Sequence, residues 1–215
     1  MMEELFSTEP KIIKRYINDG DIVFDVGYNR GLWSMAVNEN KRECIIHKFD
    51  PAIDEPGVEK IVVGRTCGKI TFYKYGTFDQ ASTIYRSLAA EAEQFKEIPI
   101  AYEMPMITID EYCKQKNIEA INFMKIDVEG AEYDVLRGSE NKLKNGEIHY
   151  IQFEYGMRYI EAGVNICEVY DFLSHYGFMV SRIEDWGLDV MTGKNKKRFD
   201  NVWWGNFFAA YGSFL

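Results

Sequence analysis

The chain has 215 residues, of which 47% are hydrophobic and 27% are charged, and this composition excludes a fibrous or intrinsically disordered protein. Its 25 basic and 34 acidic residues give a formal net charge of −9 at pH 7. Because nucleic acids and anionic membrane surfaces are bound mainly through basic side chains, this acidity argues against both as partners. We expect a single domain over residues 1–215.

The start of the chain has neither the basic residues nor the apolar stretch of a secretory signal, and no window approaches the ~20 apolar residues of a membrane span. The four cysteines are scattered, form no Cys-x-x-Cys pair and have no histidine at metal-ligand spacing: Cys44, Cys67, Cys113 and Cys167. This scatter predicts free thiols in a reducing compartment. We therefore expect a cytoplasmic protein without a membrane span.

Predicted helices and strands alternate along the chain. Helices are predicted at residues 7–18, 31–38, 89–96, 110–116 (or from Thr108), 131–143 and 166–176. Strands are predicted at residues 21–26, 44–49, 58–63, 69–75, 104–109, 121–126, 148–153, 178–183 and 201–211. The first helix precedes a core that begins at about residue 20. This alternation indicates an α/β domain with a mostly parallel sheet and helices on both faces.

The first candidate site is the turn from Asp25 to Gly31, where the first core strand meets the following helix. Open α/β sheets bind ligands at this edge, and Gly27 allows a sharp turn close to a ligand. The turn lacks the third glycine of a dinucleotide motif, and its acid would repel a pyrophosphate but suit a cationic ligand. The alternative is an ordinary glycine-containing turn.

A second candidate is Asp50, which ends the next strand about 20 residues beyond the glycines. An acidic side chain at this place can accept hydrogen bonds from both hydroxyls of a ribose. Followed by Pro51, it could equally initiate a turn, and the sequence leaves these two alternatives open.

Four acids near two strand ends form the third candidate: Asp127, Glu129, Glu132 and Glu154. Acids at the start of a helix stabilise its dipole, and Glu132 fits this alternative best. Asp127 and Glu154 end two neighbouring predicted strands, so we expect them to lie close together at one edge of the sheet. Mutual repulsion of two such carboxylates raises a pKa, which is typical of functional sites.

Four segments together resemble the FkbM family of S-adenosylmethionine-dependent O-methyltransferases: FDVGYNRG at residues 24–31, FDP at 49–51, ITIDEY at 107–112 and MKIDVEGAEYDVLRG at 124–138. The last segment is the most specific of the four. The similarity covers about residues 20–156, and Asp50 replaces the glutamate that is more frequent in the family.

The resemblance implies a class I methyltransferase fold, a Rossmann-like sheet of seven mostly parallel strands with the last one antiparallel. It also implies S-adenosylmethionine as cofactor and S-adenosylhomocysteine as product. Asp25 would approach the cationic methionine part, Asp50 would hold the ribose, and Arg65 and Thr66 would flank the adenine. The cofactor-binding residues implied in this way are Asp25, Gly27, Tyr28, Asn29, Gly31, Asp50, Arg65 and Thr66.

Methyl transfer needs the acceptor hydroxyl in line with the methyl group and a base for its proton. Asp127 and Glu154 are the candidate bases, with Glu129 as the third. No metal ligand is assigned, although a divalent ion bridging these acids to a sugar diol would also fit the chemistry. Alternatives are a polyketide or other small-molecule O-methyltransferase and a non-catalytic cofactor-binding module. A NAD-linked oxidoreductase is excluded by the glycine pattern.

The expected acceptor is a sugar or glycan hydroxyl. Three acids give a pocket rich in hydrogen-bond acceptors, which matches a polyol better than an apolar macrolide. Aromatic side chains in the expected cleft loops could stack on the C–H faces of a sugar ring: Tyr85, Tyr155, Tyr159 and Trp186. The alternative is that these aromatics are ordinary core and rim residues. The sequence gives no indication of the oligomeric state.

Overall fold

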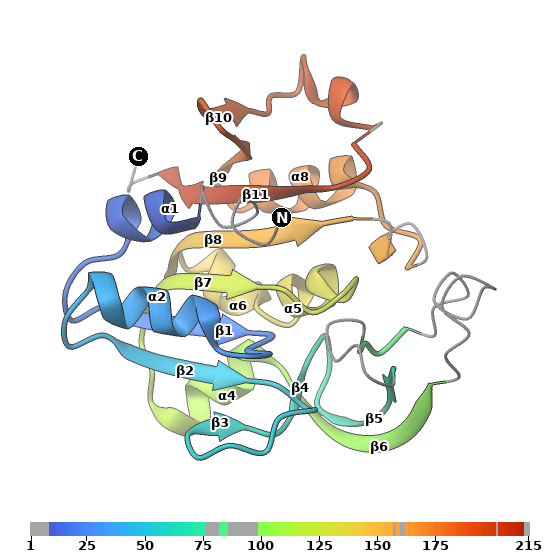
Figure 1. Cartoon of the computed structure of the whole chain (residues 1–215). Coiled ribbons are helices and arrows are strands. Elements are labelled where there is room, and N and C mark those ends of the chain that lie inside the picture. Colours follow the sequence, from blue (N-terminus) through green and yellow to red (C-terminus); the bar gives the residue numbers. More distant parts are fainter. Residues whose placement is uncertain are drawn as a thin grey trace.

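The computed structural model describes residues 9–75, 82–85, 99–156, 158–159, 162–200 and 202–212. Its main sheet contains eight strands in the order β10-β9-β11-β8-β7-β1-β2-β3 (Figure 1). These strands are β1 (Ile22–Val26), β2 (Ile45–Phe49), β3 (Val58–Glu59), β7 (Ile121–Ile126), β8 (Ile148–Tyr155), β9 (Phe178–Glu184), β10 (Gly187–Val190) and β11 (Gly205–Tyr211).

Strands β3, β2, β1, β7 and β8 are parallel, and β11 runs antiparallel between β8 and β9. The predicted mostly parallel sheet with an antiparallel last strand is therefore confirmed. The expected count of seven strands is wrong by one, because β10 pairs antiparallel with β9 and extends the edge of the sheet. Residues 187–190 alternate only weakly in hydrophobicity, and for this reason no strand was predicted there.

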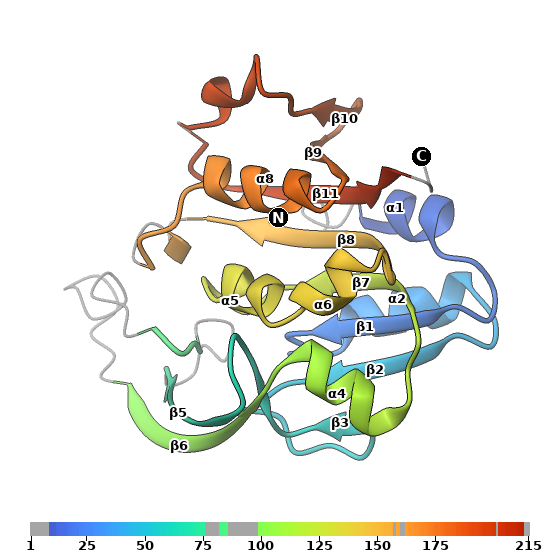
Figure 2. The same ribbon diagram turned by 180° about the vertical axis from the view of Figure 1, so that it is seen from behind.

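Helices cover both faces of the sheet. Helices α1 (Glu9–Tyr16) and α2 (Leu32–Asn40) lie on the face seen in Figure 1. Figure 2 shows the opposite face with α4 (Ile109–Lys116), α5 (Glu132–Arg137), α6 (Glu140–Lys144) and α8 (Ile166–His175). Alternate residues of the central strands pack into two hydrophobic cores, one on each face of the sheet. Phe24 and Phe207 pack toward the α4–α8 side, whereas Val23 and Phe208 pack toward α1 and α2.

A second, three-stranded sheet lies beside the main one, with β4 (Val62–Val63), β6 (Ile100–Ile107) and β5 (Gly68–Lys74) in that order. The expectation of one strand over residues 58–63 is thus wrong. Its first half, β3, pairs with β2, and its second half, β4, pairs with β6 of the smaller sheet. The predicted helix at residues 89–96 lies outside the described residues.

The predicted helix over residues 131–143 is divided into α5 and α6. At Gly138, between them, an added Cβ would lie 2.1 Å from the carbonyl oxygen of Gly64. The smaller sheet therefore packs against this point of the chain, and a side chain could not be accommodated there. Ser139 begins α6, and its hydroxyl donates a hydrogen bond to the carbonyl of Val135 at 2.7 Å.

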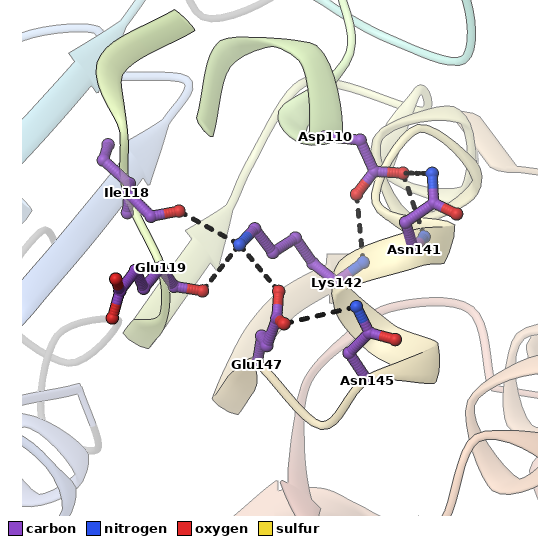
Figure 3. Close-up of polar contacts among 7 residues, drawn as sticks. All are labelled: Asp110, Ile118, Glu119, Asn141, Lys142, Asn145 and Glu147. Atoms are coloured by element: carbon purple, nitrogen blue, oxygen red, sulfur yellow. Dashed lines mark hydrogen bonds and ion pairs between the residues drawn. The ribbon is translucent and has the colours of Figure 1, made fainter. Parts of the chain in front are cut away.

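Lys142 on α6 joins the segments that precede β7 and β8 (Figure 3). Its Nζ donates to the carbonyl oxygens of Ile118 (3.0 Å) and Glu119 (2.5 Å) and to the carboxylate of Glu147 (2.7 Å). The carboxylate of Asp110 accepts the backbone amide of Lys142 at 3.0 Å. Ile118 and Glu119 precede β7, and Glu147 precedes β8, so this cluster fixes the amino ends of the two strands. It lies at the opposite end of the strands from their carboxyl ends.

None of the helices in the described ranges is long and apolar enough to cross a lipid bilayer. Each of the four cysteine side chains is described, and all four are free thiols.

Candidate active site

A cavity of about 480 Å³ opens at the carboxyl ends of the central parallel strands. The segments that follow β1, β2 and β7 line it together with the end of β8. Its volume lies within the range of small-molecule sites, roughly 300–1,000 Å³. Predicted site residues that line it are Gly27, Tyr28, Asn29, Asp50, Asp127, Glu129 and Glu154.

Gly27 allows the loops after β1 and β7 to approach closely. Its φ is +90°, and an added Cβ would lie 1.7 Å from the carbonyl oxygen of Asp127. The backbone amides of Gly27 and Tyr28 both donate to the carbonyl of Phe49, at 3.0 and 3.1 Å.

Asn29 also has a positive φ, +49°, and its buried Oδ1 has no hydrogen-bond partner among the described residues. The loop therefore presents a polar atom at the cavity that a ligand could satisfy.

Asp50 follows β2 and is 9% exposed. Its Oδ2 accepts the backbone amide of Asn29 and its Oδ1 that of Ala52, both at 2.8 Å. Burial raises the pKa of Asp50, while these backbone hydrogen bonds oppose that rise. Each carboxylate oxygen can accept a further hydrogen bond, so Asp50 can both hold the glycine loop and receive a hydroxyl from a ligand in the cavity.

Asp25 is completely buried and does not line the cavity. Its Oδ2 accepts the hydroxyl of Ser34 on α2 at 2.6 Å, and its Oδ1 lies 3.7 Å from Nζ of Lys125. Lys125 is the partner of Asp25 in the register of β7 and β1, and its Nζ also lies 3.1 Å from Oδ2 of Asp127. Burial raises the pKa of Asp25, and the charge of Lys125 counteracts this effect. The contact inferred between Asp25 and the cationic part of the cofactor stays a prediction.

Asp127, Glu129 and Glu154 form one wall of the cavity, as expected for strand-end acids. Burial, followed by the nearby charge of Asp127, raises the pKa of Glu154 to about 7 and that of Glu129 to about 8. Nε1 of Trp204 donates to Oε1 of Glu154, and Nε of Arg158 lies 3.0 Å from Oε2 of Glu129. A pKa near neutrality suits a group that takes up a proton at physiological pH.

Glu132 has a structural role. Its carboxylate is 1% exposed and accepts the backbone amides of Val128 at 2.9 Å and Gly130 at 3.0 Å. These two bonds fix the turn on which Asp127 and Glu129 lie, and Glu129 has the positive φ of +58° that the turn requires. Glu132 is an acid in the first turn of α5, as expected, but its hydrogen bonds go to the turn that precedes the helix.

The remaining predicted cofactor residues lie outside the cavity wall. Gly31 precedes α2 with a φ of +70°, and an added Cβ would lie 2.4 Å from the hydroxyl of Tyr28. Arg65 lines a separate, open groove beside α4 and α6, and Thr66 follows it in the chain. The adenine contacts inferred for Arg65 and Thr66 stay predictions.

The four predicted acceptor-binding aromatics do not line the cavity either. Tyr85 donates to Asp134 on α5 at 2.5 Å, and Trp186, 74% exposed, lies between β9 and β10. Tyr155 and Tyr159 are buried with ring centroids 4.6 Å apart. Tyr159 also borders a second, smaller cavity. Their role in acceptor binding stays a prediction.

Two features of the cavity were not identified from the sequence: Lys125 and an apolar end lined by Ile61, Val62, Val63 and Phe72. A lysine within an otherwise buried strand was a usable signal for the first, because lysine is rarely buried without a charged partner. The apolar end comes from the smaller sheet, with Val62 and Val63 on β4 and Phe72 on β5, and only the tertiary structure brings these residues to the cavity.

Among the described residues, no group of three or more His, Cys, Asp or Glu side chains is arranged to hold a metal ion.

Comparison with known proteins gives two similarities. A crystal structure of methyltransferase FkbM from Methylobacillus flagellatus KT is similar over 91% of this chain and 44% of that chain, with 11% sequence identity and a TM-score of 0.49. This chain therefore spans less than half the length of that protein. No curated protein matches the chain significantly. The family model described as the methyltransferase FkbM domain matches residues 25–180. These residues contain both the glycine loop and the strand-end acids, and the chain belongs to the FkbM methyltransferase domain family.

Proposed function

We propose that the protein is an S-adenosylmethionine-dependent O-methyltransferase that acts on a sugar or glycan hydroxyl. The observation that carries this proposal is the position of the cavity: a glycine loop with an unpartnered polar atom lies at one side and three strand-end carboxylates lie at the other. Membership of a methyltransferase family supports the same reaction class.

The residues of the cavity fit S-adenosylmethionine. Asp50 would accept the ribose hydroxyls, and the buried Oδ1 of Asn29 would gain the hydrogen bond that it lacks among the described residues. Ile61, Val62 and Phe72 would contact the flat adenine ring, since they form the apolar end of the same cavity. Any side chain at position 27 would clash with the loop after β7, so the close contact between the two loops requires a glycine there.

When bound, S-adenosylmethionine supplies an electrophilic methyl group on a sulfonium centre. The protein has to align an acceptor hydroxyl with that methyl group and to exclude water, and alignment alone provides much of the acceleration. Glu154 would accept the hydroxyl proton, because its pKa of about 7 leaves a substantial ionised fraction at neutral pH. Asp127, beside it, would orient the acceptor by a hydrogen bond. Lys125 holds Asp127 in place through the 3.1 Å ion pair.

A polyol suits the chemistry of the wall formed by Asp127, Glu129 and Glu154. Carboxylates are strong hydrogen-bond acceptors, and burying them beside an apolar macrolide would leave lone pairs unsatisfied. The hydroxyls of a sugar would satisfy them. The formal net charge of −9 disfavours polyanionic acceptors such as RNA.

Transfer of a labelled methyl group tests the proposal. The protein is incubated with methyl-labelled S-adenosylmethionine and separate panels of neutral sugars, glycosides and polyketides, and the products are identified by mass spectrometry. We expect a methylated saccharide, and Asp127→Asn should lower turnover by about 10²-fold while the Kd of S-adenosylhomocysteine changes little. Methylation of a polyketide with every saccharide ignored would make the sugar assignment wrong. Cofactor binding without transfer to any hydroxyl would indicate a binding module.

A further inference from the structure

A second cavity, of about 320 Å³, adjoins the first at the strand-end acids. Glu129, Glu154 and Trp204 line both cavities. Arg158 and Trp203 belong to the second cavity alone. A group that occupies the second cavity would therefore meet a ligand of the first cavity beside Glu154, the candidate base. The small volume suits one ring with its substituents better than a macrolide.

Trp203 and Trp204 both line this cavity. The indole of Trp204 donates its N–H to Glu154, and this bond fixes the ring at the boundary of the two cavities. Gly156 lies under the same ring, where an added Cβ would lie 3.3 Å from Cδ1 of Trp204. Trp203 is 70% exposed, so most of its surface is accessible to a ligand. A ligand ring placed against Trp203 would bury part of that surface.

Acidic side chains outnumber basic ones in the second cavity, which disfavours an anionic ligand. Glu129, Glu132 and Glu154 line it together with the single guanidinium of Arg158. Nε of Arg158 is paired with Glu129 at 3.0 Å, whereas its buried Nη1 has no hydrogen-bond partner among the described residues and could donate to a ligand oxygen. Uncharged hydroxyls, by contrast, can donate hydrogen bonds to Glu129 and Glu154 without repulsion.

We infer that this second cavity is the acceptor subsite and that it binds one uncharged sugar ring, with an apolar C–H face on Trp203 and hydroxyls toward Glu129 and Glu154. The inference rests on the proposed function and adds to it the location and the charge state of the acceptor. Aromatic stacking combined with carboxylate acceptors satisfies both the apolar and the polar side of such a ring.

The test uses calorimetric titration of two methyl glycosides, methyl fucoside and methyl glucuronide, into protein saturated with S-adenosylhomocysteine. The first glycoside is neutral and the second carries a carboxylate. The variants are Trp203→Ala, Trp203→Phe as the conservative replacement, and Tyr102→Ala as the control. Tyr102 is a comparably exposed aromatic, at 45%, that lies on β6 and lines neither cavity.

We expect wild-type protein to bind the neutral glycoside and to bind the glucuronide more weakly. Trp203→Ala should weaken binding of the neutral glycoside about fivefold or more, Trp203→Phe should restore most of it, and Tyr102→Ala should leave it unchanged. The Kd of S-adenosylhomocysteine should be the same in all four proteins. Unaltered glycoside binding by Trp203→Ala, tighter binding of the glucuronide, or no glycoside binding to cofactor-saturated protein would each overturn the inference alone. Failure to bind S-adenosylhomocysteine would instead overturn the proposed function on which it rests.

Discussion

The buried position of Glu154 beside Asp127 makes ionisation of its carboxyl group unfavourable. Burial and the charge of Asp127 raise its pKa from 4.5 to about 7, so the folded protein binds this proton more tightly than the unfolded chain does. The contribution to stability is complete below pH 4.5 and is lost as the pH rises through about 7. At neutral and alkaline pH the ionised carboxylate of Glu154 therefore makes the fold less stable.

Glu154→Gln should therefore separate activity from stability. The amide keeps an oxygen for Trp204 but has no charge, so we expect the Tm at pH 8 to rise by roughly 3–6 °C while the Tm near pH 4 is unchanged. Methyl transfer should fall by about 10²-fold. Thermal unfolding of both proteins across this pH range measures the effect. A lower Tm for the variant at pH 8 would show that the carboxylate stabilises the fold.

Lys125 should set the pH at which the acids ionise. Its positive charge lowers the pKa of Asp25, Glu129 and Glu154, so Lys125→Met should move the acidic limb of the pH–rate profile upward by about one unit. Lys48 is the matched control, because it is the partner of Asp25 on the opposite neighbouring strand, β2. Lys48→Met should leave the limb in place. Equal shifts in the two variants would indicate a general charge effect and contradict the role of Lys125.

At the scale of elements, the turn after β1 and the turn after β7 form one unit. Gly27→Ala should destabilise the protein and abolish cofactor binding, because the new Cβ would lie 1.7 Å from the carbonyl oxygen of Asp127. Gly20→Ala provides the control: its φ of +81° resembles the +90° of Gly27, but nothing lies within 4 Å of its added Cβ. It should cost only about 1–2 kcal/mol of backbone strain.

Denaturant unfolding and cofactor titration of these two glycine variants measure the difference. Similar losses of stability and binding in both would mean that backbone strain alone, and not the contact between the two turns, accounts for the effect.

Some helices and strands were predictable from the sequence and others were not. Strand β7 was predicted at its observed bounds because a buried parallel strand is a continuous apolar run. The division of residues 58–63 between two sheets, and the break between α5 and α6 at Gly138, depend on contacts with distant segments. Local hydrophobic periodicity contains no information about such contacts.

At the scale of the whole molecule, topology explains which site residues the sequence could identify. Strand-end residues of neighbouring parallel strands converge at one edge, so Asp127 and Glu154 were predicted to lie together from their positions, and both line the cavity. Asp50 was predicted separately at the end of another strand, and it lines the same cavity. Aromatic acceptor contacts were assigned by residue type without a topological constraint. Trp186 accordingly lies between β9 and β10, outside the cavity wall, whereas Trp204 lines the cavity.

The central claim is that the cavity at the carboxyl edge binds S-adenosylmethionine, and calorimetric titration with S-adenosylhomocysteine tests it most directly. Two variants form a matched pair, since Asp50 and Asp110 each accept two backbone amides, but only Asp50 lines the cavity. We expect one site with a Kd in the micromolar range, about −8 kcal/mol. Asp50→Ala should weaken it at least about tenfold, and Asp110→Ala should leave it unchanged. No binding to the wild-type protein, or equal affinities for the two variants, would contradict the claim.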